Sequence, residues 1–464
     1  APGGPDANLA SSCAMSARVA PPPPASPAGR PRRGLTSALR RFGPPLRAPP
    51  PRYASPYYNA SHHAWRLKVR EFVEQEIMPF VGDWDTAKEI PKPLYRKMAD
   101  AGLLPAVIGP PWPAEYIGPG GPENYDSFHA LIFTDELGRC GSGGVLWGIM
   151  GGLGIGLPPV YHFGSEYLKE KCVGPCLRGE KFICLAITEP YAGSDVANLR
   201  TSAVKDPSGE FYVVNGEKKW ITNGVFADFF TVAVRTGGPG PEGLSLMVIE
   251  RGMAGVETKQ MDCMGVWPSG TTYITFDDVK VPAANLIGVE NMGFMYIMSN
   301  FNYERWGIIA QTTRLARCCL EEAFKYANKR KTFGKTLVEH GMIKFKIGEM
   351  ARQVDATTAQ LEFLTYQLQA IPREEHFAHL DLIMDISLLK VQATKTFEYC
   401  AREAAQIFGG ASYTRGGQGA VIERLYREVR AFAIPGGSEE IMIDLAVKLA
   451  QKTYKRTLKR ASRM

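Results

Sequence analysis

The sequence predicts an α+β chain in which an N-terminal helical domain, a middle β domain and a C-terminal four-helix bundle follow one another. Three observations support this order: apolar residues at helical spacing, then short β-rich runs between turn signals, then four long amphipathic segments. The 464 residues, 45% hydrophobic and 22% charged, suffice for two or three globular domains. We place these domains at residues 53–180, 181–288 and 289–464, after a segment of residues 1–52 that cannot form a core.

Residues 1–52 carry the whole formal net charge of +7, with eight arginines, no lysine and one acid. The rest of the chain is balanced, so its charge indicates no nucleic-acid surface. The segment resembles a mitochondrial transit segment because it is rich in Arg and poor in acids, although its prolines would break an amphipathic helix. We therefore expect the mitochondrial matrix. The alternative is the peroxisome, because Ser462-Arg-Met464 is similar to a Ser-Lys-Leu signal. Met15 leaves the true start of the chain open.

The nine cysteines are odd in number and form no Cys-x-x-Cys pair, which is typical of a reducing compartment. Cys172 and Cys176 are spaced one helical turn apart, but no second ligand pair accompanies them, so we expect no metal site. No apolar run reaches the roughly 18–20 residues of a membrane span.

In the N-terminal domain, helical periodicity predicts helices over Ala64–Phe80, Pro93–Ala101 and Ser127–Arg139. Gly141–Gly156 is apolar and rich in glycine but lacks the phosphate-loop pattern. We expect a close-packed helix near a ligand there.

The middle domain is expected to be a small β sandwich or barrel. Its predicted strands are Phe182–Leu185, Ser202–Lys205, Phe211–Val214, Phe229–Val234, Leu244–Ile249 and Thr271–Val279.

The C-terminal domain is expected to form a four-helix bundle, because each segment has apolar residues at spacings of three and four. The predicted helices are Gly293–Arg330, Met342–Ala370, Leu380–Phe408 and Glu439–Lys455.

A turn rich in Pro, Gly and small residues follows the first strand, at Ala186–Asp195. Its backbone N–H groups and hydroxyls could face a ligand, although a plain surface turn has the same composition. About 30 residues later, Trp220-Ile-Thr-Asn-Gly224 offers an aromatic wall and a hydroxyl at the end of a hairpin. Together the two stretches favour a flat cofactor with polar edges, such as a flavin.

The chain resembles the acyl-CoA dehydrogenases over roughly residues 56–455. The likeness rests on the Ala186–Asp195 turn and on three further motifs in the family's order: Lys329-Arg-Lys-Thr-Phe-Gly-Lys335, Gln406-Ile-Phe-Gly-Gly410 and Gly436-Gly-Ser-Glu-Glu-Ile441. Asn198 and Gly341 depart from the family pattern, and the second puts one adenine-side contact in doubt. The resemblance implies the acyl-CoA dehydrogenase fold, FAD as cofactor and a homotetramer built as a dimer of dimers.

By this resemblance, Thr188 and Ser194 contact the flavin and its phosphates, Trp220 covers the ring, and Thr222 lies near flavin N5. Arg330 and Phe333 would reach the FAD of a neighbouring subunit, as would the turn that begins at Gln406. An Arg fits a diphosphate, but without the other motifs an exposed cation at a helix end would be the better interpretation of Arg330. The full set implied to bind FAD is Leu185, Ile187, Thr188, Gly193, Ser194, Trp220, Ile221, Thr222, Arg330, Thr332, Phe333, Gln406, Phe408, Gly409, Gly410, Ser438 and Glu440.

The catalytic base is expected at Glu304. Many family members carry a catalytic Glu at the position of Gly436, where this chain has no side chain. In isovaleryl-CoA and long-chain acyl-CoA dehydrogenases, a Glu on the first long helix of the bundle serves instead, and Glu304 matches it. An ordinary solvated helix residue is the alternative. If Glu304 is the base, burial should raise its pKa.

The substrate residues implied by the resemblance lie around this Glu. Asn302 and Arg305 share a helix face at i, i+3 and are similar to the pair that holds the CoA moiety. The backbone N–H at Gly436 would bind the thioester carbonyl and so acidify the α-proton. The full substrate set is Ser194, Asn302, Arg305, Gly436 and Gly437.

We therefore expect an FAD-dependent α,β-dehydrogenation of a saturated acyl-CoA to the trans-2-enoyl-CoA, in fatty-acid or branched-chain oxidation. Electrons would pass to an electron-transfer flavoprotein, and neither nucleic acid nor metal is expected as a partner. One alternative is a related acyl-CoA oxidase that uses O₂. The other is a non-catalytic assembly protein of the same fold.

Overall fold

The computed structural model describes residues 55–461, apart from 373, 374 and 377. The expectations for residues 1–52 and for Ser462-Arg-Met464 lie outside this range.

The N-terminal domain is helical, as its periodicity predicts. Its first helix, α2 (Ala60–Phe72), begins four residues earlier than expected because Asn59 caps it, and it continues as a π turn and a 3₁₀ turn to Phe80. Then follow α3 (Val81–Ala87), α4 (Pro93–Asp100), α5 (Ala114–Ile117), α6 (Ser127–Leu137) and, after a glycine-rich segment, α9 (Glu166–Leu177).

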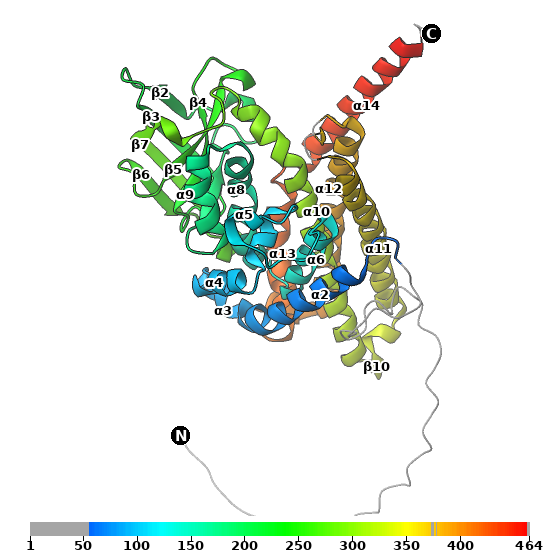
Figure 1. Cartoon of the computed structure of the whole chain (residues 1–464). Coiled ribbons are helices and arrows are strands. Elements are labelled where there is room, and N and C mark those ends of the chain that lie inside the picture. Colours follow the sequence, from blue (N-terminus) through cyan, green and yellow to red (C-terminus); the bar gives the residue numbers. More distant parts are fainter. Residues whose placement is uncertain (1–54, 373–374, 377, 462–464) are drawn as a thin grey trace, which may run out of the picture. The chain divides into compact units, whose positions relative to one another are not determined.

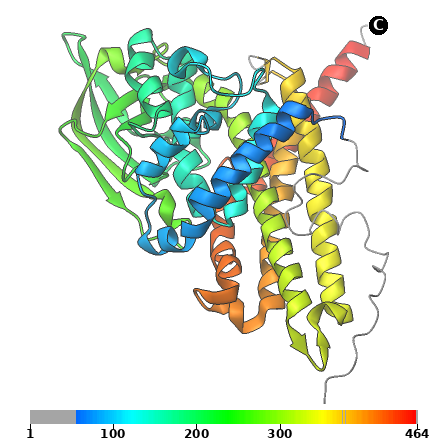
Figure 2. The same ribbon diagram turned by 60° about the horizontal axis from the view of Figure 1, so that its bottom comes forward.

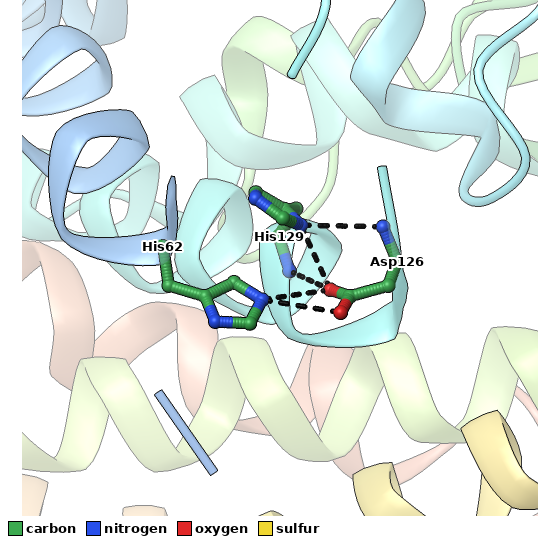
Figure 3. A group of neighbouring side chains, drawn as sticks. All are labelled: His62, Asp126 and His129. Carbon is green, nitrogen blue, oxygen red and sulfur yellow. Dashed lines mark hydrogen bonds and ion pairs between the residues drawn. The ribbon is translucent and has the colours of Figure 1, made fainter. Parts of the chain in front are cut away.

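Two buried histidines and an aspartate join α2 to α6 (Figure 3). The Asn59 N–H donates to Nδ1 of His62, so Nε2 of that ring carries the proton and donates to Asp126 at 2.9 Å. Asp126 also caps α6 by accepting from the His129 N–H, and Nδ1 of His129 lies 2.8 Å from the same carboxylate oxygen. The ring atoms that could bind a metal are thus engaged within two helix caps, and we interpret the cluster as a structural clamp.

The glycine-rich segment forms a continuous helical run from α7 (Gly143–Leu146) through the π turn η5 (Trp147–Gly151) to α8 (Gly152–Phe163). At 21 residues and a mean hydropathy of 1.3 it is long and apolar enough to cross a membrane, so our statement that no apolar run is long enough is wrong. The run is mostly buried in the protein, as expected of a core helix. A Cβ on Gly152 or Gly156 would overlap the backbone of β1, which confirms the predicted close packing.

The middle domain is one eight-stranded sheet, in the order β6-β7-β3-β2-β4-β5-β8, with β1 added parallel to β4 (Figure 1). Most neighbours are antiparallel, and β6 and β8 were not expected from the sequence. The strands are β1 (Ile183–Ala186), β2 (Ser202–Lys205), β3 (Phe211–Ile221), β4 (Phe229–Arg235), β5 (Leu244–Glu250), β6 (Val256–Gln260), β7 (Thr272–Pro282) and β8 (Leu286–Ile287).

The C-terminal domain contains the four predicted helices, which pack against one another: α10 (Gly293–Lys329), α11 (Gly341–Ala370), α12 (Leu380–Phe408) and α14 (Glu439–Ala461) (Figure 2). A fifth helix, α13 (Ala420–Ala433), was missed although its apolar residues have helical spacing. It is fixed to α7 by the buried carboxylate of Glu428, which accepts from the Gly143 and Gly144 N–H groups at 2.7 and 3.0 Å.

Candidate active site

The turn after β1 is held in place by a buried ion pair between Lys218 and Glu189. Lys218 Nζ donates to the Ile187 carbonyl at 3.0 Å and to Glu189 Oε1 at 2.8 Å, and both side chains are almost fully buried. The next residue, Lys219, donates its N–H to the Thr188 carbonyl at 2.8 Å. The turn after β1 is thus joined to the end of β3, one residue before Trp220.

Glu189 is well satisfied inside this turn. It also accepts from the Arg200 and Thr201 N–H groups at 2.7 and 2.9 Å. Burial opposes ionisation, but the charge of Lys218 and these hydrogen bonds lower the pKa of Glu189. Burial lowers the pKa of Lys218 to about 8, against the attraction of Glu189. Removing either partner would leave a buried charge unpaired, at a high cost in free energy. The two residues therefore stay paired, and the pair holds the turn in place.

The outer side of the turn is open. Among the described residues, the hydroxyls of Thr188, Ser194 and Thr222 make no hydrogen bond, and a Cβ on Gly193 would meet no atom within 4 Å. Trp220 lies at φ +59° with half of its surface exposed. Free hydroxyl groups beside an exposed indole face fit a flat ligand with polar edges, so these residues suit FAD. Leu185 lies within β1 and Ile221 is the last residue of β3, and Ile187, just after β1, is buried.

A short path of hydrogen bonds links this turn to α10. Asn223 Nδ2 donates to the Trp147 carbonyl at 3.2 Å, and Trp147 Nε1 donates to Gln311 Oε1 on α10 at 3.0 Å. The link runs through the π turn η5, a type of helical irregularity that is frequent at functional sites. It brings the Trp220–Thr222 stretch and the middle of α10 into one region.

Glu304 lies on α10, two turns before Gln311 and on the same side of the helix. Asn300 Nδ2 donates to its Oε1 at 2.7 Å. Burial raises the pKa of Glu304 to about 7, while the Asn300 bond and the charge of Arg305 oppose the rise. The predicted raised pKa is thus present. Among the described residues Asn300 Oδ1 is buried without a hydrogen-bond partner, so an acceptor remains available beside the carboxyl group.

Arg305 connects α10 to the last motif. Its Nε donates to the Gly436 carbonyl at 2.9 Å and its guanidinium donates to Asn302 Oδ1 at 3.2 Å. The structure therefore brings Asn302, Glu304, Arg305 and Gly436 together, and it buries Asn302 and Arg305. Contact of the last two with CoA remains a prediction.

The turn at Gly436 and Gly437 requires glycine. Both residues have positive φ, +70° and +101°, and a Cβ at Gly436 would lie 2.9 Å from Ile308 Cδ1. Buried Lys390 donates from Nζ to the Ala433 and Gly437 carbonyls, both at 2.8 Å. The carbonyls of both glycines are therefore held by cations. Ser438 and Glu440 follow at the start of α14, where Ser438 Oγ accepts from the Ile441 N–H.

The remaining predicted residues lie at the other end of α10. Arg330 ends this helix about 39 Å from Glu304 along its axis, at 1.5 Å per residue. Thr332 and Phe333 follow in the hairpin of β9 (Lys331–Thr332) and β10 (Lys335–Thr336), where Phe333 has φ +51° and is 96% exposed. Tyr326 stacks on Phe408 with centroids 4.2 Å apart, which places the Gln406–Gly410 turn beside this end. One chain therefore does not bring these residues to Glu304.

The sequence reasoning missed three residues of the site: Asn300, Gln311 and Lys390. The first two are polar residues one and two turns from Glu304, in a helix whose surrounding residues are largely apolar. That spacing was available from the sequence as a signal. Lys390 gave none, because only the folded chain places its ammonium group behind the Gly436 turn.

Comparison with known proteins agrees with this arrangement. Three family models match in order: the N-terminal domain of acyl-CoA dehydrogenases at residues 59–180, the middle domain at 184–279 and the C-terminal domain at 291–450. An acyl-CoA dehydrogenase of Alternaria alternata, AFT10-1, is 42% identical over 405 residues, which are 86% of this chain and 93% of that protein.

Solved structures show the same fold. An acyl-CoA dehydrogenase from Geobacillus kaustophilus is 31% identical with a TM-score of 0.76, over 85% of this chain and 99% of that one. An acyl-CoA dehydrogenase from Bacillus anthracis, solved in complex with FAD, is 27% identical with a TM-score of 0.77, over 87% of this chain and 70% of that one.

Proposed function

Because the chain belongs to the acyl-CoA dehydrogenase family of FAD-dependent oxidoreductases, we propose that it converts a saturated acyl-CoA to the trans-2-enoyl-CoA with Glu304 as the base. One observation carries the choice of base. Glu304 has a pKa raised to about 7 and lies next to Arg305, which is bonded to the Gly436 turn where the usual base is missing.

The chain's own residues would perform the proton chemistry. The ionised Glu304 removes a proton from the α-carbon, and Asn300 holds the carboxylate in place through its 2.7 Å bond. A backbone N–H of the Gly436–Gly437 turn donates to the thioester carbonyl, which stabilises the negative charge that develops there. When bound, FAD supplies the acceptor for the hydride that leaves the β-carbon.

We place FAD against Thr188, Gly193, Ser194, Trp220 and Thr222, whose free hydroxyls and exposed indole support this assignment. Arg330, Thr332, Phe333 and the Gln406–Gly410 turn are too far from Glu304 to serve the same cofactor within one chain. The exposure of Arg330, Phe333 and Gln406 supports a site shared between subunits, and so the homotetramer. Asn302 and Arg305 would bind the CoA side.

The experiment is anaerobic reduction of the purified holoenzyme with a panel of straight, branched and aryl acyl-CoAs. We expect bleaching of the flavin absorbance by at least one saturated thioester. If no thioester changes the flavin absorbance, whether the reaction is measured forward or in reverse, the result would instead favour the non-catalytic assembly protein. Turnover with an electron-transfer flavoprotein but slow reaction with O₂ is expected, and fast turnover with O₂ alone would favour the oxidase.

For the cellular location we propose the mitochondrial matrix, on the Arg-rich composition of residues 1–52. A reporter that carries residues 1–52 should enter mitochondria. Peroxisomal import of a reporter that ends in Ser-Arg-Met would favour the alternative, and with it a role outside mitochondrial fatty-acid or branched-chain oxidation.

A further inference from the structure

Gly307 is an unusual residue in the interior of α10. Glycine is among the least favourable residues in a helix, because it adds backbone entropy to the unfolded chain. The glycines of the α7–α8 run have a packing reason, since a Cβ on Gly148 or Gly152 would overlap a neighbour. A Cβ on Gly307 would meet no atom within 4 Å, although the residues that follow it on α10 are buried. The glycine therefore leaves an open space rather than allowing a close contact.

The open space lies on the side of α10 that carries the proposed base. Gly307 is one turn after Glu304 and one turn before Gln311, within about 60° of both around the helix axis. Gln311 closes the far end through its 3.0 Å bond from Trp147. A residue one turn beyond the base is in position to meet the part of a substrate that lies a few bonds from its α-carbon.

The α7–α8 run borders this region, because Trp147 is bonded to Gln311. Trp147, Gly151, Gly154 and Ile155 are the partly exposed residues of an otherwise buried stretch, and their spacing puts them on one side of the helical run. A Cβ on Gly151 would lie 2.7 Å from Thr222 Cγ2, so this side borders the Trp220–Thr222 stretch. A Cβ on Gly154 would lie 3.2 Å from Val107 Cγ1, so the two glycines of this run allow close packing, and the open space is the one beside Gly307.

We propose that Gly307 is a specificity-determining residue that admits CoA thioesters whose acyl group carries a branch or an aryl ring close to the reacting carbons. The proposal rests on the proposed function for the identity of the reaction. The predicted preference in binding does not depend on the proposed reaction, because the space beside Gly307 is a property of the folded chain. A larger side chain at this position removes the room for the bulky group and leaves a straight chain accommodated.

The test compares Gly307→Ala and Gly307→Val holoenzyme with wild type, using 3-phenylpropionyl-CoA, isovaleryl-CoA and hexanoyl-CoA. The matched control is Gly348→Val on α11, a helical glycine that also has no atom within 4 Å of its Cβ but is exposed at the surface. For Gly307→Val we expect kcat/KM for the two bulky thioesters to fall by about 10- to 200-fold relative to hexanoyl-CoA. The Ala variant should show a smaller fall in the same direction, and the control none.

Two further readouts separate the possible failures. The Tm of Gly307→Ala should be no lower than that of wild type, since Ala favours the helix, so any lost activity would not reflect misfolding. Binding of non-reactive CoA thioethers that carry the same acyl shapes, measured by calorimetry, should show the same change in preference. An unchanged ratio of bulky to straight affinity would overturn the role of Gly307, whereas wild-type flavin that no thioester reduces would overturn the proposed reaction alone.

Discussion

Arg305 Nε donates to the backbone carbonyl of Gly436 at 2.9 Å. This bond joins the residue that follows the proposed base to the position where many relatives carry theirs. The helix α10 and the turn before α14 are 131 residues apart in sequence. The bond brings the part of α10 that carries Glu304 next to the Gly436 turn, and this proximity supports the proposal that a carboxylate on α10 replaces one on the turn.

Glu304→Gln should slow flavin reduction by about 10²- to 10⁴-fold, the usual contribution of a general base. The amide keeps the shape of the side chain, so binding of a CoA thioether should change little. Because the pKa of the folded-state carboxyl is raised, its stabilising neutral form is lost as the pH rises through about 7. The variant should therefore have a higher Tm than wild type at pH 8 and a smaller difference at pH 5. Stopped-flow reduction at a near-normal rate would contradict the assignment.

The rate of flavin reduction should rise with pH through about 7, since Glu304 acts as the carboxylate, before the fall that we expect above about pH 8 from Lys390. Asn300→Leu removes the hydrogen bond that favours the ionised form, so the midpoint of the profile should move to higher pH. Rapid-mixing measurements from pH 5.5 to 9 follow both midpoints. If the midpoint of Asn300→Leu stays at that of wild type, the hydrogen bond does not set the pKa of the base.

Lys390→Met should weaken the Gly436–Gly437 turn. Two buried carbonyls lose their hydrogen-bond donor, and each loss should lower the free energy of unfolding by about 1–3 kcal/mol. The rate of flavin reduction should fall by a larger factor than the affinity for a CoA thioether. Burial lowers the pKa of Lys390 to about 8, so loss of its charge should reduce the wild-type rate above that pH. Lys395→Met, an exposed lysine on the same helix, is the control and should leave the rate and the alkaline limb unchanged. Denaturant titration and the pH profile measure the two effects.

Lys218→Met should destabilise the protein by about 3–5 kcal/mol, because it leaves Glu189 buried without its partner. The double variant Lys218→Met/Glu189→Gln should recover part of this loss. Both should retain less FAD than wild type if the ion pair positions the Thr188–Ser194 turn. Lys259→Met on the exposed face of β6 is the matched control. Equal FAD content in all four proteins would show that the ion pair serves stability alone.

Arg330→Gln should lower FAD retention during gel filtration, and the difference from wild type should shrink as the ionic strength rises, because Arg pairs with phosphate through charge and salt screens that attraction. Lys329→Gln removes an equally exposed charge one residue earlier and should have little effect. The ratio of the flavin absorbance to the protein absorbance gives the FAD occupancy. The same occupancy in both variants would leave Arg330 as an ordinary cation at a helix end.

Much of the fold follows from local patterns in the sequence. Apolar spacing predicted α10, α11, α12 and α14, and alternation with turn residues predicted most strands of the sheet. Helix α13 was missed even though Ile422, Leu425, Val429 and Phe432 have helical spacing, because glycines and a short motif precede it. The α7–α8 run is an apolar segment of membrane-spanning length that was not recognised from the sequence, and its burial against β1 explains its hydropathy.

The sequence by itself determined the motifs, their order and the candidate base, because these depend on residue types at fixed spacings. Only the tertiary structure decided which of those residues meet. Burial, which raises the pKa of Glu304, the anchoring of Gly436 by Arg305 and Lys390, and the open space beside Gly307 all arise from contacts between segments distant in the chain. The separation of Arg330 and Phe333 from Glu304 has a different cause, because it follows from the length of a single helix of 37 residues.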